Sequence, residues 1–205
     1  APKSQPVGVF LVSRPDAPQS QIRVGHLGIS FPHPDYVPLL MCNAVLGGMF
    51  TSRLNMNLRE AKGYTYGARS DFDALLAGGA FAAYAGIRTD VTAPALQEVF
   101  KEITTLLEHG VKEDELSQGK NFYSLSLPGR FETVSAIANA MSTVFIYNLP
   151  HTYWQELPKK IQAVSLADVQ RVARDHLRPA SLSVVVVGAE SAVRNSKRTA
   201  RRYRG

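Results

Sequence analysis

The stretch LGGMFTSRLNMNLREAKGYTYGAR, residues 46–69, contains the densest cluster of special residues in the chain. Its glycine pair, Gly47 and Gly48, is predicted to relieve backbone strain where one helix stops. Thr51 or Ser52 can then cap the next helix by accepting hydrogen bonds from its unpaired amide groups. This order predicts two helical segments separated by a short break.

The second helical segment has one buried face and leads directly into a strand. Its apolar residues recur at helical spacing, at Leu54, Leu58 and Ala61. Gly63 supplies the left-handed conformation that often ends a helix, and the aromatic-rich run after it has strand character. Arg59 and Tyr66 would then approach one surface, where a guanidinium and a phenol can each donate a hydrogen bond to a carbonyl oxygen. The structural alternative is an exposed Arg59 beside Glu60, with Tyr66 packed in the core and its hydroxyl at the rim.

This stretch resembles part of the pitrilysin and insulinase type zinc metallopeptidases, which include the mitochondrial and bacterial processing peptidases. The resemblance is to their second half, which binds no zinc, and it extends over roughly residues 7–190. Ten residues match at fixed spacing: Gly47, Gly48, Ser52, Arg53, Leu54, Leu58, Arg59, Glu60, Gly63 and Tyr66.

In that family an arginine and a tyrosine seven positions apart reach into the active-site cleft from the non-zinc half. The resemblance therefore implies that Arg59 and Tyr66 orient peptide carbonyl groups of the substrate and stabilise the oxyanion. Tyr64 is a further candidate for substrate binding or simply packs beside the site, because strand parity places it on the same face as Tyr66. Arg53 lies nearly opposite Arg59 on the helix, so a structural or interface role is expected for it.

The zinc half of the family carries an H-x-x-E-H motif, in which two histidines bind zinc and the glutamate acts as general base. None of the five histidines of this chain belongs to such a motif: they are His26, His33, His109, His151 and His176. Each is predicted to be a loop or surface residue, and no metal ligand is expected. Zinc is therefore expected in a partner half, either a separate subunit or a segment joined upstream, and this chain alone is expected to be inactive. A scaffold or binding protein of the same fold, without proteolysis, is the alternative, although a scaffold has no need for both Arg59 and Tyr66.

The formal net charge of +6 comes from the end of the chain. Six of the 23 basic residues lie within residues 191–205, which contain no acid, so the rest of the chain has 17 basic and 17 acidic residues. This basic tail is predicted to be solvated or disordered. Aromatic residues do not alternate with its charges as a stacking platform for bases requires, so nucleic acid is not an expected partner.

Other kinds of site are excluded by their spacing. No serine lies in a G-x-S-x-G elbow, and the glycine pairs at Gly47 and Gly78 lack the lysine and hydroxyl of a phosphate loop. The single cysteine, Cys42, excludes an internal disulfide and is predicted to be a small core residue. No stretch approaches the length of an apolar membrane-spanning helix, and we expect a soluble protein of the bacterial periplasm or cytoplasm.

The remaining periodicity predicts an α+β fold. Strands are predicted over residues 7–13, 21–29, 64–76, 79–88 and 181–187, and helices over residues 35–46, 94–109, 112–127 and 132–147, with a last helix after Ser165. The helix over residues 132–147 is predicted from apolar residues at intervals of three or four: Val134, Ile137, Ala138, Met141, Val144 and Phe145. This order predicts a single layered domain over residues 1–190, with one largely antiparallel or mixed sheet and helices packed on one face.

Overall fold

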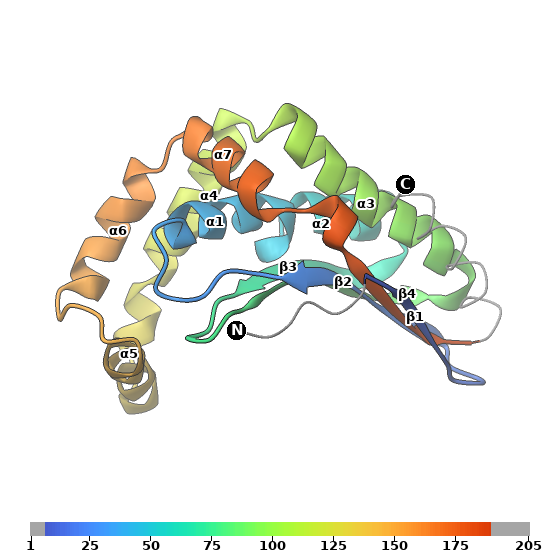
Figure 1. Ribbon diagram of the computed structural model, residues 1–205, viewed down its shortest axis with the longest axis horizontal. Helices are drawn as coiled ribbons and strands as arrows, with labels where there is room; N and C mark the ends of the chain where they lie inside the picture. The colour runs from blue at the N-terminus through green and yellow to red at the C-terminus, as the bar shows by residue number, and fades with distance from the viewer. Residues whose placement is uncertain (1–6, 190–205) are drawn as a thin grey trace.

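The structure, a computed structural model, describes residues 7–189 and contains one five-stranded sheet (Figure 1). The strands are β1 (Val9–Ser13), β2 (Gln19–Leu27), β3 (Thr65–Asp73), β4 (Ala80–Arg88) and β5 (Ser183–Gly188). Their order across the sheet is β1-β5-β2-β4-β3. Only the β1–β5 pair is parallel among these strands, and the other pairs are antiparallel. The predicted α+β class with a mixed sheet is confirmed.

The helices follow the predicted order, and the sheet has its helical layer on one face (Figure 1). They are α1 (Tyr36–Asn43), η1 (Ala44–Gly48), α2 (Arg53–Asn55), η2 (Met56–Ala61), α3 (Thr92–His109), α4 (Glu113–Ser126), α5 (Val134–Ile146), α6 (Tyr153–Ala163) and α7 (Leu166–His176), with short turns at η3 (Thr89–Val91), η4 (Pro128–Phe131) and η5 (Pro179–Ser181). Most predicted elements lie within three residues of their predicted bounds. The predicted tail, residues 191–205, lies outside the described residues, so the domain boundary stays a prediction.

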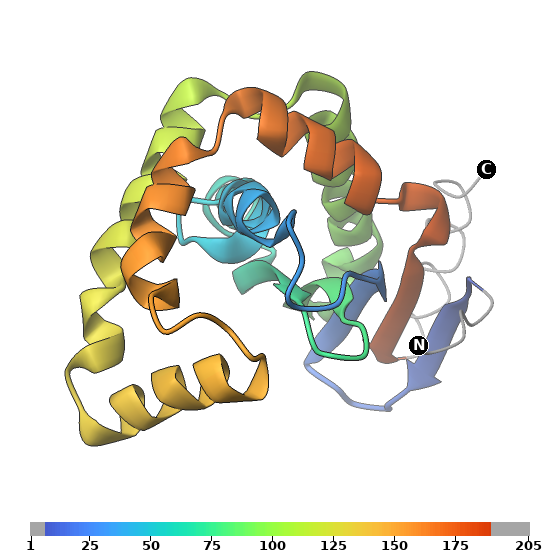
Figure 2. The same cartoon turned by 60° about the vertical axis from the view of Figure 1, so that its left-hand side comes forward.

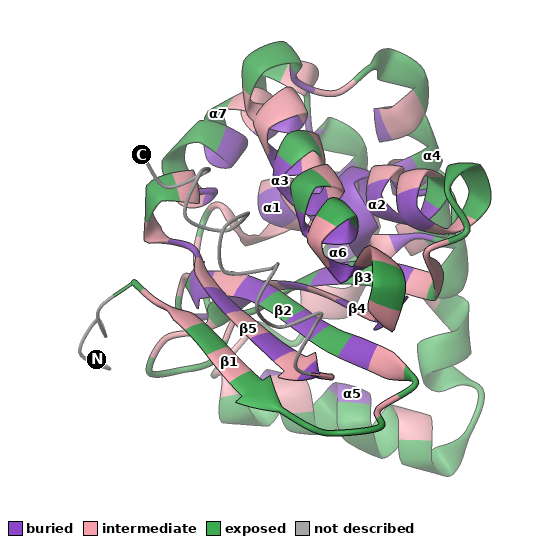
Figure 3. Cartoon of the chain, turned by 90° about the vertical axis from the view of Figure 1, so that its right-hand side faces the viewer, coloured by how far each residue is buried: buried purple, intermediate pink, exposed green. Residues whose placement is uncertain are grey.

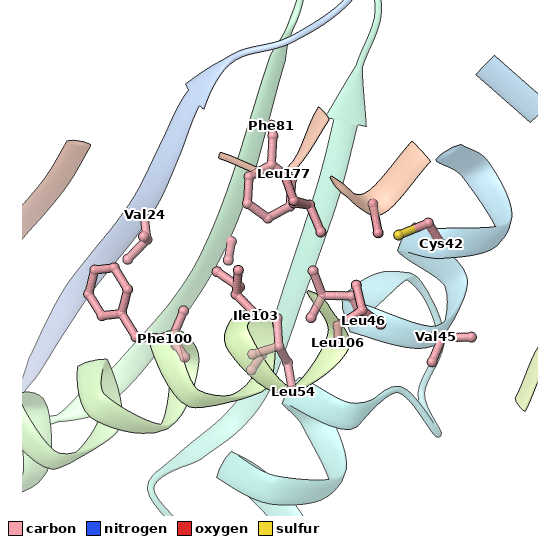
Figure 4. Packing of buried hydrophobic residues seen from close by; sticks show 14 of the residues in the cluster. Val24, Cys42, Val45, Leu46, Leu54, Phe81, Phe100, Ile103, Leu106 and Leu177 are labelled. Atoms are coloured by element: carbon pink, nitrogen blue, oxygen red, sulfur yellow. The ribbon is translucent and has the colours of Figure 1, made fainter. Parts of the chain in front are cut away.

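The core lies between the sheet and the helices that cover it. Side chains along β2 and β5 alternate between buried and accessible, as strands with one covered face require (Figure 3). Val24 of β2 and Phe81 of β4 pack with Phe100 and Ile103 of α3 in a single hydrophobic cluster (Figure 4). Cys42 belongs to the same cluster, and burial raises the pKa of its thiol to about 12, so its predicted role as a core residue is confirmed.

The segment Tyr36–Ala61, which joins α1 to η2, runs through this core. It is 26 residues long and reaches a mean hydropathy of 1.3, which is enough to cross a membrane by length and composition. The prediction that no stretch approaches that length is therefore wrong. However, 61% of the apolar window is buried inside the domain, as is typical of the core helix of a globular protein.

Candidate functional site

The predicted pair of site residues lies on the two sides of a tight turn. Arg59 belongs to η2, and Tyr66 is the second residue of β3. Between them Gly63 has a φ of 60°, which confirms the predicted left-handed conformation. The turn is closed by backbone hydrogen bonds from Gly63 N to Arg59 O (3.0 Å) and from Tyr64 N to Leu58 O (2.8 Å). The backbone on both sides of the pair is therefore fixed.

Asparagine side chains hold η2 and its neighbours against the rest of the domain. Asn55 donates from Nδ2 to Phe50 O (2.7 Å) and accepts at Oδ1 from the backbone N–H of Ala68 (3.2 Å), which joins α2 to β3. Asn57 donates to two carboxylates of α3, those of Glu98 (2.8 Å) and Glu102 (2.6 Å). α2 is thus bonded to β3, and η2 is bonded to α3. These bonds hold the backbone that carries Arg59 in one position.

A β-bulge sets the direction of Tyr66. Thr65 pairs with Ile87 and Ala68 pairs with Ala85, so two residues of β3 oppose one residue of β4 between these pairs. The Thr65 hydroxyl stabilises the bulge, because it donates to Gly86 O (2.7 Å) and accepts from the backbone N–H of Gly67 (3.0 Å). Tyr66 is consequently 88% exposed, and its hydroxyl makes no hydrogen bond within residues 7–189.

The alternative interpretation, an exposed Arg59 beside Glu60 and a Tyr66 packed in the core, is correct for Arg59 and wrong for Tyr66. The Arg59 side chain is 39% exposed and forms an ion pair with Glu60 (Nε to Oε1, 3.4 Å), as that alternative predicted. Its guanidinium also lies 4.6 Å from the centre of the exposed Phe50 ring, a cation–π contact. Tyr66, in contrast, is not packed in the core. The exposed Tyr66 phenol and the partly exposed Arg59 guanidinium are each accessible to a ligand.

Tyr64 and Arg53 occupy different environments from this pair. Tyr64 precedes β3 and is half-buried against the core, with Lys62 Nζ 5.8 Å from its ring centre. Arg53 binds Glu115 through two hydrogen bonds, from Nε to Oε1 (2.7 Å) and from Nη2 to Oε2 (2.6 Å). Burial is the largest single influence on the pKa of Glu115 and raises it, but the hydrogen bonds from Arg53 and from the Lys112 backbone, together with the positive charges of both residues, leave that pKa lowered. The predicted structural role of Arg53 is confirmed.

Sequence reasoning missed the contact that positions β3 behind the site. Asn43 and Ser70 exchange two buried hydrogen bonds, from Asn43 Nδ2 to Ser70 O (2.8 Å) and from Ser70 Oγ to Asn43 Oδ1 (2.7 Å). A Cβ on Gly47 would lie 2.4 Å from Ser70 N, so this glycine allows the helix to approach β3 closely. Asn43 is a polar residue within an apolar helical stripe, and this pattern in the sequence could have predicted the bridge.

Two other predictions from the sequence are wrong. Ser52 stands at the N-cap of α2, but it makes no capping hydrogen bond, and its buried Oγ has no partner within the described residues. His26 was expected on a loop or the surface, whereas it is buried in β2 against Phe81. Burial lowers the pKa of His26, which favours the neutral imidazole.

Three potential metal ligands lie together near the start of α1, but they already bind one another. The ligand atoms of His33, Asp35 and His176 lie within 4.8 Å of one another. Asp35 accepts from Arg171 at Oδ1 (2.7 Å) and pairs with His176 Nε2 through Oδ2 (2.7 Å). The backbone N–H of Asp35 donates to His33 Nδ1 (3.1 Å). This cluster is explained as an internal bridge between α7 and the loop before α1, without a metal.

Comparison with known proteins agrees with this architecture. Residues 2–123 match the family model described as the peptidase M16 inactive domain. The non-peptidase homolog YmxG of Helicobacter pylori is 31% identical over 147 residues, which cover 70% of this chain and 33% of that protein. An uncharacterised zinc protease of Streptomyces coelicolor is 27% identical over 168 residues, which cover 82% of this chain and 37% of that protein. The chain thus spans little more than a third of the length of these relatives.

A solved structure shows the same fold. The crystal structure of a peptidase M16 inactive domain from Pseudomonas fluorescens matches with a TM-score of 0.83 and 26% sequence identity, over 89% of this chain and 43% of that one. The family match covers more than half of the chain, and it confirms the resemblance to the non-zinc half of these peptidases. The chain therefore belongs to the peptidase M16 inactive-domain family.

Proposed function

We propose that this chain is the substrate-binding, catalysis-completing half of a two-part zinc metallopeptidase that cleaves peptides or unfolded polypeptides. In this proposal Arg59 and Tyr66 are the catalytic residues that it contributes. The observation that carries the proposal is the exposure of Tyr66, which the bulge in β3 directs away from the core although a tyrosine gains stability from packing.

Family membership implies a zinc-bearing catalytic half elsewhere, and the chemistry divides between the two halves. The partner half would hold the zinc ion, which would activate a water molecule as the nucleophile. The Arg59 guanidinium and the Tyr66 phenol donate hydrogen bonds to peptide carbonyl groups of the substrate. The hydrogen bonds around the turn and the bulge fix the backbone that carries both donors, which supports their preorganisation for oxyanion stabilisation. Tyr64 is proposed to flank the bound peptide.

The test is a cleavage assay on an unfolded peptide, with this chain and the zinc-bearing half purified separately. Neither half is expected to cleave alone, whereas the mixture is expected to do so. The double variant Arg59→Ala, Tyr66→Phe should lower kcat/KM of the mixture on the order of a hundredfold or more.

Arg14→Ala is the matched control, because Arg14 is an exposed arginine in the turn between β1 and β2 and lies outside the proposed site. Its activity should equal that of the wild type. Full activity of the double variant would overturn the assignment of Arg59 and Tyr66, and cleavage by this chain alone would overturn the division of labour.

A scaffold function is the second candidate, since one relative is itself described as a non-peptidase homolog. A scaffold of this fold would form a stable complex with its partner without cleavage, and the double variant would bind as the wild type does. The same assay therefore separates the two candidates.

A further inference from the structure

α5 is the most exposed apolar helix in the described part of the chain. Its 13 residues, VSAIANAMSTVFI, include no charged side chain. Val134 and Phe145 are each 87% exposed, and Ile137 and Met141 are also exposed. Large apolar side chains on a surface, with no charge among them, indicate a face that another molecule covers.

Four of the five exposed large apolar side chains of α5 form one continuous stripe, and Ile146 lies to one side of it. Val134, Ile137, Met141 and Phe145 follow one another at intervals of three and four residues, so they lie along one side of an α-helix. This spacing is that of the seam between two packed helices. The other side of α5 carries Ser, Thr and Asn side chains, so the stripe has a polar border.

The attachment of α5 to its own domain is slight. Only Ala140 and Val144 of this helix are buried, and Trp154 Nε1 donates a hydrogen bond to Ala140 O (3.0 Å). A cavity of about 270 Å³ lies where α5 meets η4. Figures 1 and 2 place α5 at one end of the molecule, and Figure 3 shows it mostly in the colour of exposed residues.

We propose that the α5 stripe, defined as Val134, Ile137, Met141 and Phe145, is a docking surface for a helix of the zinc-bearing half. This inference rests on the proposed function. The relatives matched here have nearly two thirds of their length outside the region that this chain matches, so they contain enough further chain to cover the helix.

Two other occupants fit the observations less well. A helix that lies on a lipid surface carries Lys and Arg on its polar side, whereas the polar side of α5 has none. A symmetric dimer through this helix alone would bury little, because α5 is only about 20 Å long and a stable interface needs roughly 800 Å² from each partner. The zinc-bearing half would meet that requirement by covering other parts of this chain as well.

The experiment compares binding of the zinc-bearing half to this chain and to the variant Val134→Asp, Phe145→Asp. Both side chains are exposed, so circular dichroism and thermal melting should be unchanged. We expect Kd for the zinc-bearing half to rise about a hundredfold or more, because two apolar contacts are lost and two charges are buried. Asn139→Asp is the control, since it adds a charge to the polar side of the same helix and should leave Kd unchanged.

The outcomes separate this inference from the proposed function. Unchanged binding of the double variant would overturn the docking surface, while the effect of Arg59→Ala, Tyr66→Phe on cleavage would still test the function. Loss of self-association in the double variant, without effect on the zinc-bearing half, would overturn the inference in favour of a second copy. Binding of the wild type to anionic lipid vesicles but not to the zinc-bearing half would overturn it in favour of a membrane.

Discussion

α5 and α7 are helices of the same domain, but their compositions and environments are opposite. α7 carries five ionisable side chains in 11 residues, yet Val169, Val172 and Ala173 are buried against the core. α5 carries no charged side chain in 13 residues, yet only Ala140 and Val144 are buried. Hydrophobic composition therefore does not determine burial here. The two helices differ in whether the described part of the chain provides a surface that packs against their apolar side.

The docking of α7 shows how a charged helix becomes part of a core. Its apolar side packs into the main cluster, while Arg171 and His176 both bind Asp35 in front of α1. The charges therefore add specific bonds at the edge of an apolar contact. α5 has an apolar stripe of comparable length, but a single hydrogen bond to Trp154 and little apolar contact beneath it.

The largest expected difference between the two helices is in the cost of removing one valine. Val172 is fully buried, so Val172→Ala should lower the free energy of unfolding by about 2 kcal/mol. Val134→Ala removes the same two methyl groups from an exposed position and should change that free energy by less than about 0.5 kcal/mol. Denaturant unfolding of both variants measures the difference. Equal costs would mean that α5 is packed in solution, contrary to the structure.

A smaller effect is expected from the bridge that fastens α7. The hydrogen bond from Arg171 holds the pKa of Asp35 at about 2, below its ordinary value of 3.8. A lowered pKa in the folded state gives stability that is present above about pH 4 and is lost as the pH falls toward 2.

Asp35→Asn should therefore cost about 1–2 kcal/mol at pH 7 and flatten the loss of stability between pH 4 and pH 2. Arg171 is half exposed, so the lower end of this range is expected. Thermal melting of both proteins between pH 2 and pH 7 provides the measurement. An unchanged pH profile in the variant would show that the bridge does not form.

The smallest effect is expected at the hydrogen bond between Trp154 and α5. Trp154→Phe removes the Nε1 donor to Ala140 O and should lower global stability by about 1 kcal/mol or less. Hydrogen exchange should increase mainly in α5, with α7 unaffected, because the lost bond is made to α5. Equal acceleration of hydrogen exchange in α5 and α7 would contradict the conclusion that α5 is attached more weakly than α7.

Much of the fold was predictable because local signals and tertiary packing agree. Gly63 ends η2 in the left-handed conformation as expected, and Ser165 with Asp168 caps α7 as a capping box. The core face of β2 follows the simple alternation of its side chains. At the site, the sequence predicted which residues to examine, Arg59 and Tyr66, through ten matches at fixed spacing to a known family.

Other features depend on contacts between residues far apart in the chain. Gly47 is required because Ser70 approaches its backbone, and no local pattern reveals that approach. His26 is buried because it lies on the covered face of β2, where it packs against Phe81 of β4. The exposure of Tyr66 follows from a bulge that exists only once β3 pairs with β4.

The sequence by itself determined the secondary structure, the family and the candidate pair, because these depend on spacing along the chain. Tertiary structure alone decided which apolar helix is buried and which is exposed, since burial depends on the surface opposite each helix. It also decided that the Tyr66 phenol points away from the core while Tyr64 packs against it. Those orientations arise from strand pairing and close packing, which act between segments that the sequence places far apart.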